Sequence, residues 1–203
     1  DILKDRMYTF QQNSPLRRGS QMVLCKVVTS LAQLMAPILS FTAEDVWSVL
    51  PGKSQENRIS VHLETFPEVV VLKDQETLES QWKELLEIRA LVLGALEQQR
   101  RDKVIGSSLE AQVILQTTPD RYRFLLHYEK DLPAFFIVSQ VTLKEIEKIS
   151  IEDHLAADTS LGVSVNATKA LGEKCERCWN YLSTVGAQSK HPTLCHRCVE
   201  AVS

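Results

Sequence analysis

The sequence contains few glycines, and none of them lie close together. All seven glycines are at least ten residues apart along the chain. A phosphate-binding loop and a dinucleotide-binding turn each need several glycines within a short stretch, because their backbone must approach the phosphates closely. The spacing therefore excludes both nucleotide-binding motifs from these 203 residues.

The sequence also lacks the motifs of common hydrolases. It contains no His-Glu-x-x-His and no Gly-x-Ser-x-Gly motif. No motif in the sequence identifies a general base that could activate a nucleophile. We therefore expect no catalytic residue in this chain, which by itself should be inactive as an enzyme.

Long apolar runs are missing as well. The longest runs, 69–72 and 134–138, are far shorter than the roughly 18 residues that cross a bilayer. The N-terminal residues do not resemble a signal peptide, and the first residue is Asp1 rather than Met. With 44% hydrophobic and 24% charged residues, we expect a soluble fragment of one to three domains with no membrane partner.

The net charge of −3 is unevenly distributed. Residues 1–26 carry a formal charge of +3, and the remainder carries −6. The basic residues of this segment are Lys4, Arg6, Arg17, Arg18 and Lys26. Such an excess is typical either of contact with a polyanion or of an ordinary solvated face, and charge alone favours the solvated face.

Four of the five cysteines form two Cys-x-x-Cys pairs near the C-terminus. Cys175 and Cys178 are separated from Cys195 and Cys198 by 16 residues, which is the spacing of a four-thiolate zinc site. Because four thiolates fill the tetrahedron around one Zn(II), the ion is expected to be structural. Disulfides or a thioredoxin-like redox pair are the alternatives, and both lack their usual sequence context here.

Three further possible ligands are set aside. Cys25 is expected to be a small core residue of a helix. His191 and His196 are expected at the surface, because four thiolates already complete the site.

Helical periodicity dominates the first half of the chain. It predicts a short helix over 1–10 and a long helix that begins with Ser20 as its cap and ends at Pro37. A capping box at 42–45 predicts the start of a third helix. One apolar stripe of the long helix is expected to face the core: Leu24, Val27, Val28, Leu31, Leu34 and Met35.

The second half changes from helical to alternating periodicity after a further long helix at 77–103. Strands are predicted at 111–116, 134–142 and 161–168, and a helix is predicted from Pro119 to about residue 130. We expect these strands to be antiparallel with one helix across them.

The predicted fold is therefore multidomain. It comprises an α-helical bundle over 1–52, a connector and long helix over 53–106, a small α+β unit over 107–170 and a C-terminal four-cysteine zinc module over 171–203.

Four segments carry a resemblance to a known family. They are DILKDRMY at 1–8, APILSFTAEDVW at 36–47, KVIGSSLEA at 103–111 and KCERCW at 174–179. In this order they resemble the C-terminal portion of bacterial- and organellar-type isoleucyl-tRNA synthetases, which are class I isoleucine–tRNA ligases. The resemblance covers nearly the whole chain and implies that its helical bundle is of the anticodon-binding type.

The resemblance implies a parent enzyme that attaches isoleucine to tRNA(Ile) using ATP. The family's catalytic domain, which binds ATP, and its editing domain are absent from these residues. We therefore expect a monomeric tRNA-binding piece that recognises the anticodon stem-loop and works with the catalytic domain of the parent chain. Its expected location is a reducing compartment, namely the bacterial cytoplasm, the plastid stroma or the mitochondrial matrix.

Arg177 and Trp179 flank Cys178 and are the main residues that we expect to contact RNA. A tryptophan ring can stack on an unpaired base, worth about 1–3 kcal/mol, and an arginine can donate two hydrogen bonds or form a second stacking plane. Alternatively, Trp179 covers the zinc and Arg177 forms a surface ion pair. The other predicted RNA contacts are Arg17, Arg18, Lys4 and Arg6.

Two other functional classes stay open. The same cysteine spacing resembles the zinc finger that ends formamidopyrimidine-type DNA glycosylases, where a hairpin carries an arginine toward the duplex. Here the loop over 180–194 contains Lys190 but no arginine, and residues 172–203 carry only +1, which is weak for duplex DNA. A protein-interaction zinc ribbon is the third possibility.

Overall fold

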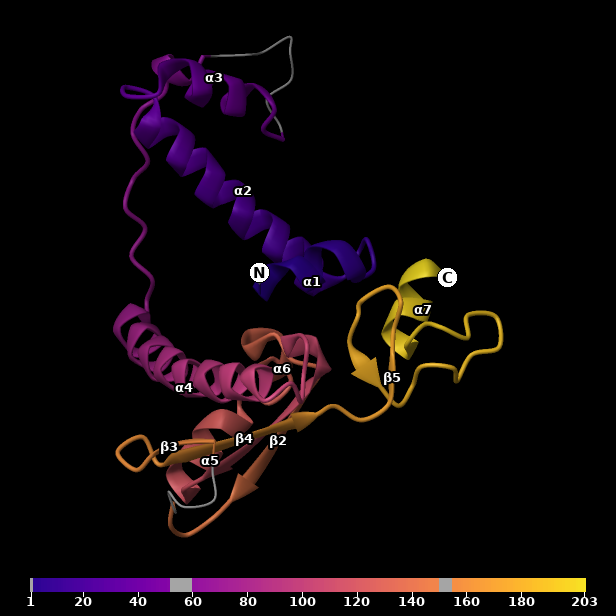
Figure 1. Cartoon of the computed structure of the whole chain (residues 1–203). Helices are drawn as coiled ribbons and strands as arrows, with labels where there is room; N and C mark the ends of the chain where they lie inside the picture. Colours follow the sequence, from indigo (N-terminus) through magenta and orange to yellow (C-terminus); the bar gives the residue numbers. More distant parts are fainter. Residues whose placement is uncertain (1, 52–59, 150–154) are drawn as a thin grey trace. The chain divides into compact units, whose positions relative to one another are not determined.

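A computed structural model describes residues 2–51, 60–149 and 155–203, which form two compact units (Figure 1). One unit is Gln12–Gln75, and the other joins Asp1–Gln11 with Glu76–Ser203. The domain boundaries expected from the sequence remain predictions. None of the described helices combines the length and the apolar character that crossing a bilayer requires.

The unit Gln12–Gln75 is built on the helix α2, Pro15–Met35. Proline suits the first turn of a helix, because the N–H that it lacks has no partner there. The predicted start at Ser20 was therefore wrong: Ser20 is buried inside α2 and donates to the carbonyl oxygen of Leu16 at 2.8 Å. The helix ends just before Pro37, as predicted.

The helix α3, Ser40–Ser48, begins earlier than the capping box predicted, with Leu39 at its N-cap. Glu44 accepts hydrogen bonds from the Ser60 hydroxyl at 2.8 Å and from the Val61 N–H at 3.0 Å. These bonds tie α3 to the short 3₁₀ helix η2, Val61–Leu63. The carboxylate of Glu44 thus joins α3 to η2.

The core of this unit consists mainly of small side chains, which let α2 and α3 approach closely, and of one large side chain, that of Trp47. The buried cluster consists of Ala32, Ala36, Ala43, Trp47 and Val61. The stripe of α2 that was expected in the core is instead 36–52% exposed. Its helical period was read correctly, but the described residues of Gln12–Gln75 place no second layer over that face.

The other unit contains a four-stranded sheet in the order β2-β1-β4-β3. Its strands are β1 Ala111–Thr117, β2 Gln140–Glu145, β3 Ala156–Asp158 and β4 Val163–Lys169. The central strand β1 runs antiparallel to β4 but parallel to β2. The prediction of a purely antiparallel sheet was therefore wrong, because a helical crossover returns the chain parallel to β1.

That crossover contains α5, Pro119–Leu126, and α6, Leu132–Phe136. The predicted single helix to residue 130 ends at Leu126, and the strand predicted over 134–142 begins only at Gln140. Pro133 lies in the first turn of α6, and Ile137 ends the helix in the left-handed conformation at φ 60°. A short apolar run does not distinguish a buried helical turn from a buried strand.

The long helix α4, Gln75–Arg101, supplies one wall of the main core. Its buried residues are Leu85, Ile88, Val92, Ala95 and Leu96, and they pack in one cluster with the buried side of the sheet. The backbone closes α4 with Lys103 in the left-handed conformation at φ 58°, and the 3₁₀ helix η3, Ser108–Glu110, leads into β1. The predicted long helix is confirmed.

Candidate functional site

The C-terminal residues fold as two knuckles around four buried cysteines. The short strands β5, Glu173–Lys174, and β6, Tyr181–Leu182, pair around the first knuckle, and α7, His196–Val202, begins in the second. The same backbone hydrogen bond occurs in both knuckles. The N–H of Trp179 donates to the carbonyl oxygen of Cys175 at 2.8 Å, and the N–H of Val199 donates to the carbonyl oxygen of Cys195 at 3.0 Å.

The four sulfurs fit one tetrahedral metal ion. All four Sγ atoms lie within 4.8 Å of one another, and those of Cys178 and Cys195 are 3.7 Å apart. A tetrahedron with Zn–S bonds of about 2.3 Å separates its sulfurs by roughly 3.8 Å. All four cysteines are buried and free of disulfides, so the arrangement is that of a closed structural site.

The protein environment shifts the pKa values of Cys175, Cys195 and Cys198 in different directions. Burial raises the pKa of Cys195 and of Cys198. Burial also opposes ionisation of Cys175, but the N–H groups of Cys178, Cys195 and Arg177 outweigh it and lower the pKa of Cys175 to about 6. A divalent cation is therefore needed to hold Cys195 and Cys198 as thiolates.

A glycine is required where the chain enters the first knuckle. Gly172 has φ +90°, and a Cβ atom there would lie 2.4 Å from the carbonyl carbon of Leu182. Only glycine allows the two backbones to approach this closely. The β5–β6 pairing that presents Cys175 and Cys178 thus depends on this residue.

Trp179 follows the first knuckle and is held with its ring in solvent. The residue is 60% exposed and has a left-handed backbone at φ 65°. The ammonium of Lys174 lies 5.7 Å from the ring centroid. Sequence reasoning missed Lys174, although it directly precedes Cys175 within the segment that carries the family resemblance.

Arg177 points toward the N-terminal helix α1, Ile2–Thr9. Its guanidinium donates to the carbonyl oxygens of Thr9 and of Tyr8, the latter at 3.4 Å, and to the Sγ atom of Cys198 at 3.6 Å. These partners are backbone carbonyls and a metal ligand rather than the carboxylate of a surface ion pair.

Arg197 occupies the matching position in the second knuckle and was missed by sequence reasoning. Its two terminal nitrogens donate to Asp5 of α1 at 2.5 and 2.8 Å, and its guanidinium lies 4.6 Å from the centroid of the Phe10 ring. The signal in the sequence was the repeated Cys-x-Arg-Cys pattern.

The predicted basic contacts fall in different units. Lys4 is exposed on α1, where Arg6 forms an ion pair with Asp131 at 2.6 Å. In the unit Gln12–Gln75, Arg17 is half-buried, and Arg18 is exposed and donates to Asn13 and Gln21. Each unit thus presents its own basic groups.

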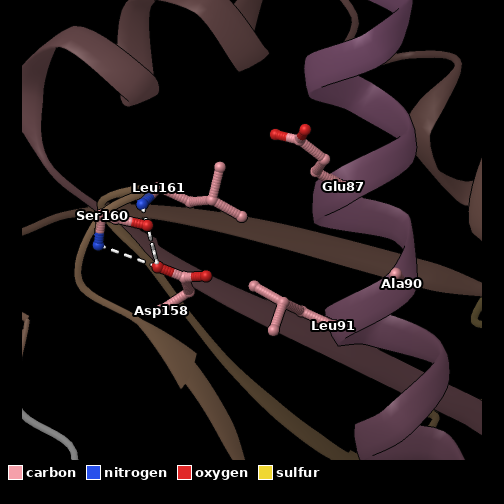
Figure 2. A pocket seen from close by; sticks show the side chains of 6 residues that line it. All are labelled: Glu87, Ala90, Leu91, Asp158, Ser160 and Leu161. Atoms are coloured by element: carbon pink, nitrogen blue, oxygen red, sulfur yellow. Dashed lines mark hydrogen bonds between the residues drawn. The ribbon is translucent and has the colours of Figure 1, made fainter.

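Figure 2 shows a separate recess between α4 and the loop that joins β3 to β4. Its lining residues are Glu87, Ala90, Leu91, Asp158, Ser160 and Leu161. Hydrogen bonds from the Ser160 hydroxyl and from the Leu161 N–H lower the pKa of Asp158. The carboxylate of Asp158 is thus used to close the loop.

His196 is exposed beside Glu200 and is not part of the cysteine cluster, as expected from the sequence.

Comparison with known sequences connects both parts to one group of proteins. Residues 1–115 match the family described as the anticodon-binding domain of tRNA ligase, and residues 172–201 match the zinc finger found in FPG and IleRS. The chain is 44% identical over 202 residues to the isoleucine–tRNA ligase of Geobacter sulfurreducens. It is 42% identical over 204 residues to that of Syntrophotalea carbinolica and 41% over 202 residues to that of Moorella thermoacetica.

These alignments cover 100% of this chain but only 21%, 21% and 22% of the three relatives, so the chain spans about a fifth of their length. The zinc-finger match and the cysteine geometry agree, and the C-terminal module holds one structural zinc ion. The resemblance drawn from four segments is confirmed. The chain belongs to the family of anticodon-binding domains of tRNA ligases.

Proposed function

We propose that this chain recognises the anticodon stem-loop of tRNA(Ile) and that it belongs to a longer isoleucine–tRNA ligase. The other domains of that parent chain would bind ATP, activate isoleucine and transfer it. The piece described here would bind RNA as a monomer without catalysing. Because its zinc ligands must stay reduced, we assign it to a reducing compartment such as the bacterial cytoplasm, the plastid stroma or the mitochondrial matrix.

The exposed ring of Trp179 is the observation that carries this proposal. A left-handed backbone costs a residue other than glycine about 1–2 kcal/mol, and a ring that is 60% exposed recovers little of that cost by burial. Strain of this kind is concentrated at functional sites. A large aromatic ring in this position is accounted for by a contact with a partner.

The surroundings of the ring suit a nucleotide. Unpaired RNA bases stack on aromatic rings, and the phosphate groups bind to cationic side chains such as lysine and arginine. Lys174 brings an ammonium to within 5.7 Å of the centroid of the Trp179 ring. We propose that a base stacks on Trp179 and that Lys174 contributes positive charge beside it.

Arg177 has a different proposed role in this account. Its guanidinium is used by carbonyl oxygens of α1, so a direct base contact would require it to leave them. We therefore propose that Arg177 first positions the knuckle that carries Trp179. Lys4, Arg6, Arg17 and Arg18 are proposed as weaker, salt-sensitive phosphate contacts.

Binding to tRNA(Ile) and to duplex DNA of equal length, each at two salt concentrations, tests the proposal. We expect the zinc-loaded chain to prefer the tRNA and to lose affinity for it as salt rises. Equal or stronger binding to the duplex would favour the glycosylase-type alternative. Binding to neither nucleic acid would favour a protein-interaction ribbon.

A further inference from the structure

The two zinc knuckles present the same side chain to the same helix. Each knuckle has the sequence Cys-x-Arg-Cys, and both arginines reach α1. Arg177 is 168 positions from its partner Thr9, and Arg197 is 192 positions from its partner Asp5. α1 and the zinc module belong to one compact unit. The metal site is therefore in direct contact with the start of the anticodon-binding segment.

Arg197 holds the side of α1. It makes a bidentate ion pair with Asp5, whose side chain is 29% exposed, and it lies over the ring of Phe10. Planar, two-point pairing of this kind is among the stronger polar contacts that proteins form. Asp5 is itself held by the Thr9 hydroxyl, which donates to its carboxylate at 2.6 Å.

Arg177 holds the C-terminal end of α1. The last carbonyl groups of a helix have no partner within the helix, and a cation placed there satisfies them and favours the helix dipole. Arg177 donates to the carbonyls of Tyr8 and Thr9 and also contacts Sγ of Cys198. One guanidinium thus joins a metal ligand to the end of the helix.

The charges of the two parts also match. Four thiolates around Zn(II) leave a net charge of −2, and Arg177 and Arg197 together supply +2. A structural zinc module folds around its ion, so removal of the metal also removes the fixed knuckles from which Arg177 and Arg197 reach α1.

We propose that zinc binding and docking of the end of α1 are one linked equilibrium, with Arg177 and Arg197 as the positioning residues. An eight-residue helix is marginal by itself, so its last turn depends on these anchors. By reciprocity, the factor by which zinc stabilises the docked helix end is the factor by which the docked helix end tightens zinc binding. Zinc thereby orders a segment outside its own module.

Two measurements on the full chain test this linkage without RNA. The first compares hydrogen exchange of residues 5–11 in the zinc-loaded and the zinc-stripped chain. The second follows zinc release to a chelator in Asp5→Asn, which keeps the shape of the side chain but removes its charge. Asp131→Asn is the matched control, because Asp131 pairs with Arg6 of the same helix and contacts no knuckle residue in the described contacts.

We expect zinc removal to speed exchange in residues 5–11 by about tenfold or more, and Asp5→Asn to speed zinc release by a similar factor. Asp131→Asn should leave zinc release unchanged. Unchanged exchange after zinc removal, or native zinc release in Asp5→Asn, would overturn the proposal. Equal acceleration by both asparagine variants would also overturn it, because general loosening of α1 would then explain the effect.

Discussion

Replacement of Trp179 by alanine separates a partner-facing ring from a ring that supports the fold. Because the residue is 60% exposed, its removal leaves little of the cavity that makes core tryptophan substitutions cost about 3–5 kcal/mol. We expect Trp179→Ala to change the free energy of unfolding by no more than about 1 kcal/mol and to keep one zinc per chain.

The effect on RNA binding should be much larger. Loss of one base stack costs about 1–3 kcal/mol, which is roughly a 5- to 150-fold loss of affinity. Fluorescence anisotropy with a labelled anticodon stem-loop measures this loss directly. Trp179→Phe, which keeps an aromatic face, should recover part of the affinity.

Trp47→Ala is the matched control for the effect of removing an indole ring. Trp47 is only 1% exposed, so its truncation should destabilise the unit Gln12–Gln75 by about 3–5 kcal/mol. The reasoning about Trp179 would be refuted if Trp179→Ala lost zinc or thermal stability while each folded molecule kept its affinity for RNA. Trp179 would then belong to the metal module's core.

Three further outcomes follow from the geometry. Gly172→Ala should weaken zinc retention, measured by transfer to a chelator, because its Cβ would lie 2.4 Å from the Leu182 carbonyl carbon; native zinc retention would contradict this reasoning. Lys103→Gly should stabilise the chain by about 1 kcal/mol in thermal unfolding, because glycine suits the left-handed residue at φ 58° that ends α4; a lowered midpoint would contradict this. Zinc affinity should fall as the pH falls from 8 to 6, because the raised pKa values of Cys195 and Cys198 make zinc displace at least two protons. The dissociation constant for zinc should therefore rise by about two decades or more per pH unit, and a constant that does not change with pH would contradict this.

The four-cysteine cluster of the zinc module could be predicted from the sequence because its chemistry is local. Two residues between the cysteines of each pair and a loop between the pairs are enough to bring Cys175, Cys178, Cys195 and Cys198 together. The structure places their sulfurs within 4.8 Å, so spacing and geometry agree.

The contacts of the module with α1 could not be predicted in this way. Asp5 and Arg197 are 192 positions apart, and the local sequence around each residue does not predict that they form an ion pair. The strand order of the sheet could not be predicted for the same reason, since β1 pairs with β2 and with β4, which lie far from it along the chain. Local pattern predicted the strand β1 but not the direction of its neighbours.

Apolar patterns gave the period of an element more reliably than its surroundings. The stripe on α2 has helical spacing, yet it is exposed within the described residues, while Ala32 and Ala36 make the close contact with α3. The run at 134–138, predicted as part of a strand, is buried for the most part but lies at the end of a helix, because Pro133 favours a first turn.

The zinc-loaded chain is proposed to recognise an anticodon loop through Trp179. The most direct test of this proposal is the affinity of the zinc-loaded chain for the anticodon stem-loop of tRNA(Ile), beside the same stem carrying a different anticodon. We predict tighter binding to the isoleucine anticodon, with the difference lost in Trp179→Ala. Equal affinity for both loops, or a preference that survives the loss of the ring, would contradict the account.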